Sequence, residues 1–309
     1  MSKEPNFTEI SVCRVKNNGA IVYESDALAV EEPLEIRLGF TENDRPTHKS
    51  ISITMRTPGD DFELAAGFLF TEGIIESAAQ INKIGYCGVS KKVENRRNTV
   101  RVDLRSDVKI DFKRLERHFY TSSSCGVCGK TSIEALQTGV RRLEEEAKPV
   151  FTAEIIHRLP EVLRNFQNVF DRTGGLHAAA LFDAAGEMEN LREDVGRHNA
   201  VDKLIGMQFL AGKTPVADKL LLVSGRASFE LVQKALMAGI PILAAVGAPS
   251  SLAVELAGEY GMTLLGFVRD NRFNIYCGAE RIKGAIDLAA EKFESVKFEK
   301  AKASIIAAQ

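Results

Sequence analysis

The C-terminal half of the chain alternates apolar, strand-like runs with helical segments, and this alternation restricts the fold more than any other feature. Three apolar runs lie at Leu220–Val223, Ile240–Val246 and Met262–Val268. Helical patterns follow the first two runs and extend through Met237 and Tyr260. Near-continuous apolar strands separated by helices are typical of a parallel sheet that helices cover on both faces. The sequence therefore predicts an α/β fold for this half.

The segments that follow these strands carry residues suited to binding an anion. They are Ser224–Ser228, Gly247–Ser251 and Arg269–Arg272. In open α/β sheets ligands bind at the carboxyl ends of the strands, where helix N-termini also point N–H groups at anions. Arg269 and Arg272 favour a phosphate or a guanine-type base over a neutral sugar or lipid. The alternative is that these are ordinary loops with solvated arginines.

The N-terminal part has a different pattern, with alternating β-rich runs and one helical segment. A turn at Asn17–Gly19 separates the first runs. We interpret residues 1–146 as a smaller α+β domain, followed by an α/β domain at residues 147–309. The expected elements of the first domain are strands at Ile10–Val15, Leu34–Leu38, Ser50–Arg56 and Asn98–Leu104, and a helix at Phe62–Phe70 packed on the small sheet.

The middle of the chain suggests a second cluster of polar groups. A helical stretch interrupted by Pro160 precedes a strand at Leu176–Phe182 and a hairpin turn at Ala185–Gly186. The polar run Arg192–Asn199 then opens a helix, and so many ionisable groups at one strand-to-helix junction suggest a site. For His198 alone, a hydrogen-bonding residue at a helix start is an equally good interpretation.

A serine-led Cys-x-x-Cys, Cys125 and Cys128, lies in a loop with two glycines. Thr131 and Glu134 have the spacing of a capping box, so a helix is expected to begin directly after the loop. The helix N-terminus and Lys130 would lower the pKa of both thiols and favour the nucleophilic thiolate. The spacing alone leaves open half of a zinc site, a structural disulfide or two idle cysteines.

Composition sets limits on partners and location. The 309 residues have a net charge of -2, which argues against binding a nucleic acid backbone. The N-terminus lacks a signal-peptide run, and no apolar stretch approaches the roughly 20 residues of a membrane span, so we expect a cytoplasmic protein. Five scattered cysteines fit reduced thiols better than disulfides. Cys13 and Cys87 are expected to be small apolar fillers.

Taken together, the motifs resemble those of the FdhD family, the formate dehydrogenase accessory sulfurtransferases. The resemblance extends over nearly the whole chain, and the six motifs in this order are far more specific than the cysteine pair alone. They are Phe62–Ile75, Cys125–Gly129, Gly174–His177, Glu193–Asn199, Ser224–Arg226 and Phe267–Arg272. Only the tail beyond about Glu291 has no counterpart.

The resemblance implies a function. Members pass sulfur from a cysteine desulfurase to the molybdenum cofactor, in its bis-molybdopterin guanine dinucleotide form, before the cofactor enters formate dehydrogenase. The first cysteine of the loop, Cys125, would carry the persulfide, with Cys128 able to resolve it as a disulfide. The resemblance also implies a cytidine deaminase-like fold for the second domain. Cofactor binding, for which GDP would be a surrogate ligand, carries over to Phe267, Val268, Arg269, Asp270, Asn271 and Arg272.

Two other function classes remain to be weighed. A zinc-dependent deaminase requires His-x-Glu and Pro-Cys-x-x-Cys, but Ser124 precedes Cys125 and no histidine is followed two residues later by glutamate. We therefore expect no metal site. A non-catalytic chaperone that escorts the cofactor would share the same binding residues and stays open. Because the cofactor has two guanine arms, a two-fold homodimer could offer one pocket to each, and we expect a homodimer.

Overall fold

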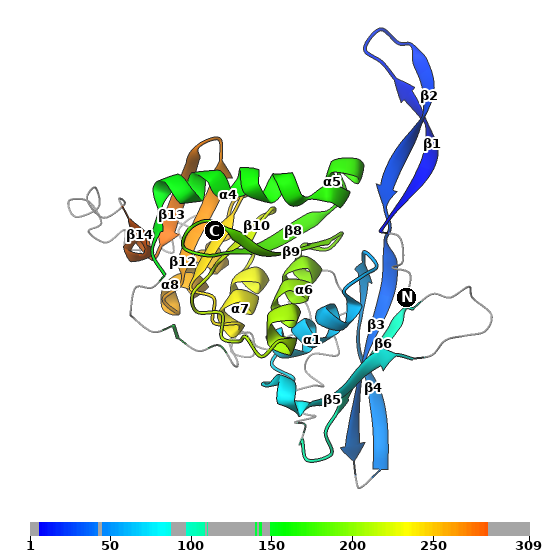
Figure 1. Cartoon of the computed structure of the whole chain (residues 1–309), viewed down its shortest axis with the longest axis vertical. Coiled ribbons are helices and arrows are strands. Elements are labelled where there is room, and N and C mark those ends of the chain that lie inside the picture. The colour runs from blue at the N-terminus through cyan, green and yellow to red at the C-terminus, as the bar shows by residue number, and fades with distance from the viewer. Residues whose placement is uncertain are drawn as a thin grey trace, which may run out of the picture.

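The computed structural model of the chain describes residues 6–42, 45–87, 97–108, 110, 140, 142–143 and 149–283. In this part of the chain a six-stranded sheet and a four-stranded sheet make up the body, and a two-stranded hairpin projects from it (Figure 1). No helix of the described ranges is long and apolar enough to cross a membrane. The Cys-x-x-Cys loop, the helix expected after it and the tail beyond 291 lie outside these residues.

The large sheet has the strand order β13-β12-β11-β10-β8-β9. Its central strands β10, β11 and β12 are parallel, as predicted, whereas β8, β9 and β13 pair antiparallel at the two sides. The sheet is therefore mixed and not purely parallel. Its strands are β8 (His177–Phe182), β9 (Met188–Asp194), β10 (Leu220–Val223), β11 (Ile242–Ala245), β12 (Thr263–Arg269) and β13 (Arg272–Cys277).

Helices cover both faces of the large sheet, so the predicted three-layer α/β/α arrangement is confirmed (Figure 1). Successive side chains of a strand point to opposite faces. Leu221 and Val223 accordingly pack with α6, α7 and α8, whereas Leu220 and Leu222 pack with α4. The helices are α4 (Ala153–Phe166), the short α5 (Asn168–Thr173), α6 (Arg197–Leu210), α7 (Phe229–Met237) and α8 (Ser251–Glu259). Beside this sheet, β7 (Phe151–Thr152) pairs with β14 (Ile282–Lys283), which follows the one-turn helix η2 (Ala279–Arg281).

The predicted interruption of a helix at Pro160 is wrong, because α4 continues through this residue. A proline inside a helix removes one backbone hydrogen bond and clashes with the preceding turn. Here Ile156, Leu159 and Leu163 are buried on one face of α4. Burial of this apolar stripe against the sheet outweighs the local cost of the proline.

The smaller sheet has the order β4-β3-β6-β5 and is covered by α1 (Asp61–Thr71). The opposite side of α1 lies against α6 so closely that a methyl group at Gly67 would overlap the backbone carbonyl of Asp202. Buried residues of both sheets consequently belong to one continuous hydrophobic cluster. The predicted domain boundary at 146/147 lies outside the described residues. The strands are β3 (Glu32–Glu42), β4 (Arg45–Arg56), β5 (Ile81–Tyr86), preceded by η1 (Ala78–Gln80), and β6 (Thr99–Leu104).

The projecting hairpin, which we call the arm, consists of β1 (Phe7–Val15) and β2 (Ile21–Ala29). Its turn at Asn17–Gly19 is as predicted, with Gly19 at a φ of 78°. At its base the ring of Phe7 lies 5.0 Å from the guanidinium of Arg172 at the end of α5. Cys13 is exposed on β1, so its predicted role as an apolar filler is wrong.

Candidate functional site

Segments that are far apart in the sequence meet at one edge of the large sheet, which we call the ligand edge. The carboxyl ends of the parallel strands β10, β11 and β12 lie there. Since β8 runs antiparallel to β10, the start of β8 lies at the same edge, and His177 of β8 pairs with Asp194 at the end of β9. Helix α6 begins directly afterwards. Four of the six sequence motifs thus converge: Gly174–His177, Glu193–Asn199, Ser224–Arg226 and Phe267–Arg272.

Backbone hydrogen bonds hold the loops of the ligand edge side by side. The N–H of Phe267 donates to the carbonyl oxygen of Gly247 at 3.0 Å, and the N–H of Gly247 donates to that of Gly225 at 2.9 Å. On the next strand, Ala178 donates its N–H to the hydroxyl of Ser224 at 2.9 Å. A side chain at Gly225 would contact the imidazole of His177. The loops therefore form one continuous backbone surface.

The predicted nucleotide-binding segment is the hairpin between β12 and β13. Asp270 and Asn271 form its turn, each with a φ of 53°, as a two-residue hairpin turn of right-handed twist requires. Arg269 and Arg272 are directly opposite each other in the strand register, and both are exposed. Like charges that face each other across a strand pair are destabilising. An anion placed between the two guanidinium groups would remove that repulsion.

Phe267 adopts an uncommon backbone conformation at the base of this hairpin. Its φ is 54°, a region that is costly for a bulky side chain and that occurs mostly where the surroundings enforce it. The strand register shifts between Gly266 and Arg269, so the strand bulges here. The guanidinium carbon of Arg269 lies 5.7 Å from the centre of the Phe267 ring, whereas Val268 is fully buried. The bulge places the aromatic ring and the arginine on the ligand edge and sends Val268 into the core.

Two histidines at this edge are held neutral by their surroundings. Burial is the main cause that lowers the pKa of His198 to about 3, and the charges of Lys234 and Arg197 lower it further. Burial likewise lowers the pKa of His177. The Nε2 atom of His198 lies 3.4 Å from the hydroxyl of Ser228 and 3.9 Å from a carboxylate oxygen of Glu230. Both partners lie on the same ring nitrogen, so this is not the geometry of a hydrolytic triad, in which the carboxylate orients the other nitrogen.

A buried ionic cluster lies close enough to His198 to affect its pKa, and it was not predicted from the sequence. The ammonium of Lys234 lies 2.9 Å from Asp202, 2.9 Å from the hydroxyl of Thr71 and 3.2 Å from Glu72. Burial alone would lower the pKa of Lys234, but the two carboxylates raise it, so the ammonium stays charged. The only sequence signal was a charged residue in an apolar helix, which by itself does not identify its partners.

A second buried ion pair fixes the turn that leads into α6. The ammonium of Lys203 lies 2.7 Å from Asp194, and the same carboxylate accepts the backbone N–H of Thr57 at 3.2 Å. Lys203 also donates to the carbonyl oxygen of Thr57 at 2.9 Å. The end of β4 is thereby fastened to the junction of β9 and α6. The polar run Arg192–Asn199, in which a site was suspected, thus includes residues that hold the structure together.

Comparison with known proteins decides the family. The sequence model of the FdhD/NarQ family matches residues 29–283. The chain belongs to this family. It is 53% identical over 273 residues to the sulfur carrier protein FdhD of Streptomyces avermitilis, covering 88% of this chain and 94% of that protein. It is 44% identical over 269 residues to the protein of the same name from Saccharolobus solfataricus, covering 87% and 95%. A crystal structure of a candidate formate dehydrogenase accessory protein from Desulfotalea psychrophila superposes with a TM-score of 0.69 at 26% identity, covering 90% of this chain and 100% of that one.

The FdhD/NarQ assignment confirms the resemblance and the α/β class, and it leaves the site residues as predictions. Cys125 and Cys128 lie outside the described residues. Phe267–Arg272 lies at the ligand edge, where the sequence placed it. In the described part of the chain no group of three or more His, Cys, Asp or Glu side chains is arranged to hold a metal ion. A cytidine deaminase-like fold remains a prediction.

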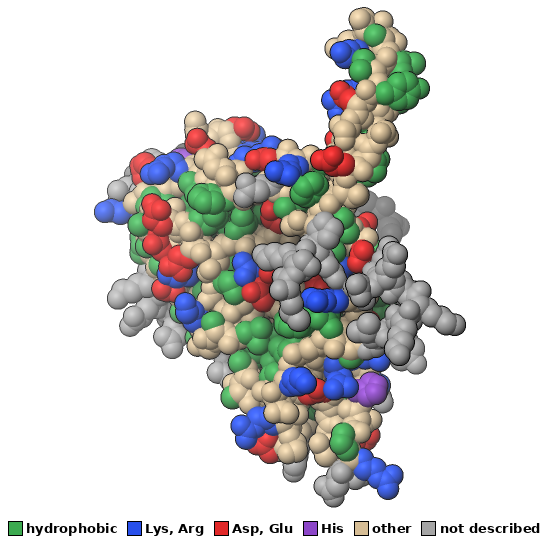
Figure 2. All heavy atoms as spheres, turned by 45° about the vertical axis from the view of Figure 1, so that its right-hand side comes forward, with side chains coloured by type: hydrophobic (Ala, Val, Ile, Leu, Met, Phe, Trp, Pro, Cys, Tyr) green, Lys and Arg blue, Asp and Glu red, His purple; other side chains and the backbone are tan. Residues whose placement is uncertain are grey.

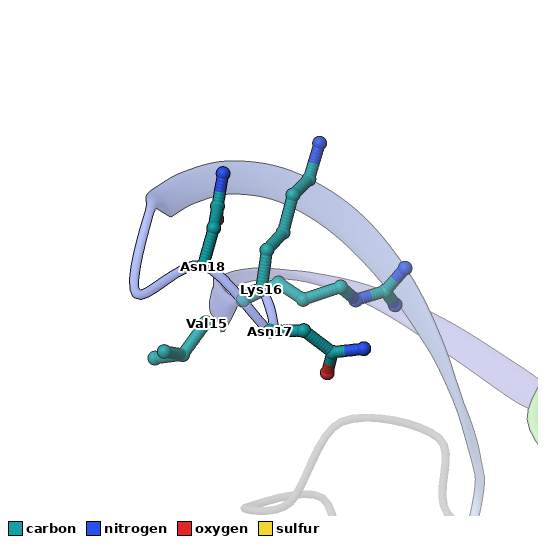
Figure 3. A pocket seen from close by; sticks show the side chains of 5 residues that line it. Val15, Lys16, Asn17 and Asn18 are labelled. Atoms are coloured by element: carbon teal, nitrogen blue, oxygen red, sulfur yellow. The ribbon is translucent and has the colours of Figure 1, made fainter.

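A hollow elsewhere on this FdhD/NarQ protein is a poor alternative site. It lies at the tip of the arm and is lined by Arg14, Val15, Lys16, Asn17 and Asn18. Figure 3 shows that these side chains point in different directions and do not converge on a common point. Recognition of a small molecule needs convergent polar groups, which the arm tip does not offer.

Proposed function

We propose that this protein is a sulfur carrier that accepts sulfur as a persulfide on Cys125 from a cysteine desulfurase. It then passes the sulfur to the molybdenum cofactor, in the bis-molybdopterin guanine dinucleotide form, before the cofactor enters formate dehydrogenase. The observation that carries this proposal is the family match over residues 29–283, a range that includes the Cys-x-x-Cys. Relatives that share about half of its residues are named sulfur carrier proteins.

The transfer needs only thiol chemistry. The Cys125 thiolate attacks the outer sulfur of the donor's persulfide, the sulfur–sulfur bond of the donor breaks, and the donor cysteine leaves as a thiolate. Cys125 then holds the outer sulfur. If no acceptor takes it, the Cys128 thiolate can attack the inner sulfur of Cys125, which forms a disulfide and releases hydrosulfide. Cys128 therefore serves to remove a persulfide that no acceptor has taken, and it is not needed for the transfer of sulfur from the donor to Cys125.

We assign the guanine nucleotide part of the cofactor to Phe267–Arg272. Arg269 and Arg272, opposite each other on the hairpin, can donate paired hydrogen bonds to phosphate oxygens. Asp270 can accept from the N–H groups of guanine, and the ring of Phe267 can stack on the base. The neutral His177 and His198 are compatible with an anionic cargo, because neither of them requires a counter-ion. The protein would act in the cytoplasm as a homodimer, in which each subunit offers a pocket to one guanine arm.

The strongest alternative is a non-catalytic chaperone that binds the cofactor and escorts it to formate dehydrogenase. The ligand edge would look the same in such a protein. Only sulfur on Cys125 separates the two functions. A zinc-dependent deaminase is disfavoured, because His177 and His198 are followed two residues later by Ala179 and Ala200 and not by glutamate. A structural zinc is a separate alternative. Metal analysis would show it as stoichiometric zinc that is lost on mutating either loop cysteine.

The deciding experiment is intact-mass spectrometry after incubation with a cysteine desulfurase and cysteine. We expect the wild type to gain one sulfur atom, the Cys125→Ala variant to gain none, and the Cys128→Ala variant to load normally. Cys13→Ala is the matched control, because Cys13 is an exposed thiol outside the motif. Formate dehydrogenase maturation should follow the same order. Full maturation with Cys125→Ala would instead support the chaperone.

A further inference from the structure

Arg197 forms a second positively charged group at the ligand edge, away from the β12–β13 hairpin. It is the first residue of α6, which begins shortly after the end of β9. Its Nε atom is buried and has no hydrogen-bond partner within the described part of the chain. A buried donor without an acceptor costs free energy, so such a group calls for an explanation. Its position at the ligand edge suggests that the acceptor belongs to a ligand.

Arg197 differs in one respect from the other arginines that share this feature. Three more arginines have a buried Nε atom without a hydrogen-bond partner, but each of them forms an ion pair with a carboxylate. They are Arg37 with Glu35, Arg101 with Asp103 and Arg281 with Glu280. In the described ranges Arg197 forms no ion pair with any carboxylate. Its charge is therefore not compensated by the chain that the structure describes.

The carboxylates around the histidines of the ligand edge restrict where an anion can bind. Asp194 and Glu72 are ion-paired with buried lysines, which balance their charge. Glu230 lies 3.9 Å from Nε2 of the neutral His198, on the side of α7. An anion beside Arg197 is therefore repelled on the side of Glu230 and favoured on the side of β8.

The surroundings of Arg197 on that side consist of hydrogen-bond donors. A cation at a helix N-terminus has the unfavourable sign with respect to the helix dipole. Gly196, the N-cap of α6, has no side chain to accept from the first-turn N–H groups, and the first turn contains no acidic residue. His177 and His198 lie near enough to Arg197 for its charge to lower the pKa of both, and a neutral imidazole still offers one N–H donor. An oxyanion is the acceptor that suits these groups.

This group is separate from the arginine pair of the hairpin. His177 belongs to β8 and Arg269 to β12, and the strand order between them is β12-β11-β10-β8. Neighbouring strands lie about 4.8 Å apart, so three spacings separate the two places by about 14 Å. One phosphate-sized anion cannot contact both of them. The ligand edge therefore has room for two anionic groups.

We propose that Arg197 and His177 form a second anion subsite of the ligand edge, which takes a phosphate group. The subsite deepens the proposed function and rests on it only for the identity of the natural ligand. That ligand is either the nucleotide held at the hairpin, through a phosphate that extends along the edge, or a separate phosphate compound. Binding of a phosphate group to Arg197 is common to both.

The test is calorimetric titration of the full chain with inorganic pyrophosphate. It is done in an Arg269→Ala/Arg272→Ala background, so that the hairpin arginines do not contribute. Adding Arg197→Gln should weaken pyrophosphate binding at least about tenfold, because a charge-assisted, forked contact is lost. Arg197→Lys should weaken it less, because the ammonium keeps the charge without the fork.

Arg45→Gln in the same background is the matched control, since it removes the same charge. Arg45 is exposed at the start of β4, whose other end leads to Thr57 and its bond with Asp194. At about 3.3 Å per residue, the length of β4 places Arg45 about 36 Å from that end. On the face that Figure 2 shows, Lys and Arg side chains are interspersed with Asp and Glu, so no broad basic surface there should hold pyrophosphate. The control should bind it as its parent does.

A second readout separates a binding role of Arg197 from a structural one. Without ligand, Arg197→Gln should be as stable in urea as its parent or more stable, because a cation is removed from a helix N-terminus. Lower stability of Arg197→Gln, an unchanged pyrophosphate affinity, or equal weakening by Arg197→Gln and Arg45→Gln would each overturn the proposal.

The source of the phosphate group is decided with the hairpin arginines in place. If the group belongs to the nucleotide at the hairpin, Arg197→Gln weakens GDP binding and leaves GMP binding unchanged. If it belongs to a separate compound, GDP binding is unchanged, and pyrophosphate still binds to the GDP-saturated protein. Equal binding of GDP and ADP would contradict the guanine assignment alone. Sulfur loading of Cys125 is measured separately, so the failure of either assignment leaves this subsite standing.

Discussion

Arg269 and Arg272 face each other across a two-residue turn, and this pair leads to a residue-scale prediction. Replacing Arg269 by alanine should weaken GDP binding about ten- to a hundredfold, because one charge-assisted contact contributes roughly 1.5–3 kcal/mol. GDP should bind more tightly than ADP, since adenine presents the opposite donor pattern to Asp270. Calorimetric titration of both nucleotides measures these differences.

Arg105→Ala is the control for this titration, since Arg105 is an exposed arginine directly after β6, with its side chain 58% exposed. It should bind GDP as the wild type does. Equal affinity for GDP and ADP, or an unchanged affinity in Arg269→Ala, would remove the guanine site from this hairpin and leave the persulfide chemistry untouched.

His198 gives a second prediction at this scale, which concerns acid stability. Its pKa is about 3 in the folded protein and 6.5 for an unperturbed histidine. Between these values unfolding takes up a proton, so the free energy of unfolding should fall as the pH drops from about 6.5 towards 3. In His198→Gln this decrease should be shallower, as measured by urea denaturation at a series of pH values.

His48→Gln serves as the control, because His48 is exposed on β4. Its stability should follow the pH dependence of the wild type. Burial also lowers the pKa of His177. Part of the decrease in the free energy of unfolding at low pH should therefore remain in the His198→Gln variant. An unchanged slope in His198→Gln would mean that this imidazole does not remain neutral in the folded state.

At the scale of elements, the contact between α1 and α6 depends on two glycines. A methyl group at Gly206 would overlap the carbonyl oxygen of Glu63, just as one at Gly67 would overlap that of Asp202. Forcing the helices apart should lower the free energy of unfolding by about 1–3 kcal/mol or more for either alanine substitution. Urea denaturation of Gly67→Ala and Gly206→Ala tests this.

Gly258→Ala is the matched control, because Gly258 lies in α8 with nothing within 4 Å of an added methyl group. Alanine is the better helix former by about 1 kcal/mol, so this variant should be as stable as the wild type or more stable. A destabilised Gly258→Ala together with a stable Gly67→Ala would show that the helix contact is not close.

The elements that sequence predicted well are those with strong local signals. The parallel strands β10–β12 and helix α1 appeared at or within two residues of their expected places, because continuous apolar runs and helical periodicity are encoded locally. Strand β2 was not recognised as the partner of β1. The exposure of Cys13 could not be predicted from the sequence either, since it depends on the projection of the β1–β2 hairpin away from the two sheets. Pro160 was misjudged because packing outside the helix decides whether a proline is tolerated.

At the scale of the whole molecule, the two sheets behave as one structure. One hydrophobic cluster extends from Leu34 in β3 to Leu264 in β12. The bonds of Asp194 and Lys203 to the backbone of Thr57, directly after β4, also join the two parts. The sequence predicts two domains because the pattern of strands and helices changes near residue 147, and the boundary at 146/147 stays a prediction. A change of pattern along the chain does not show whether the parts share a core.

The candidate site was predictable in its location and not in its contacts. Strand ends rich in Gly, Ser and Arg indicated the ligand edge, and the position of Phe267–Arg272 there agrees with the rule for open sheets. The φ of Phe267, the neutral state of His198 and the charge of Lys234 near it arise from tertiary packing. No spacing in the sequence encodes them.

The separation of the ligand edge from the core has a consequence for evolution. Under the proposed function, substitutions in the loops after β10, β11 and β12 would change binding and remove little packing, whereas substitutions in the strands would change packing and leave recognition intact. The loops of the ligand edge could therefore change in sequence while the strands of the core stay the same. A carrier built in this way could be adapted to a different cargo through its loops alone, without a new framework.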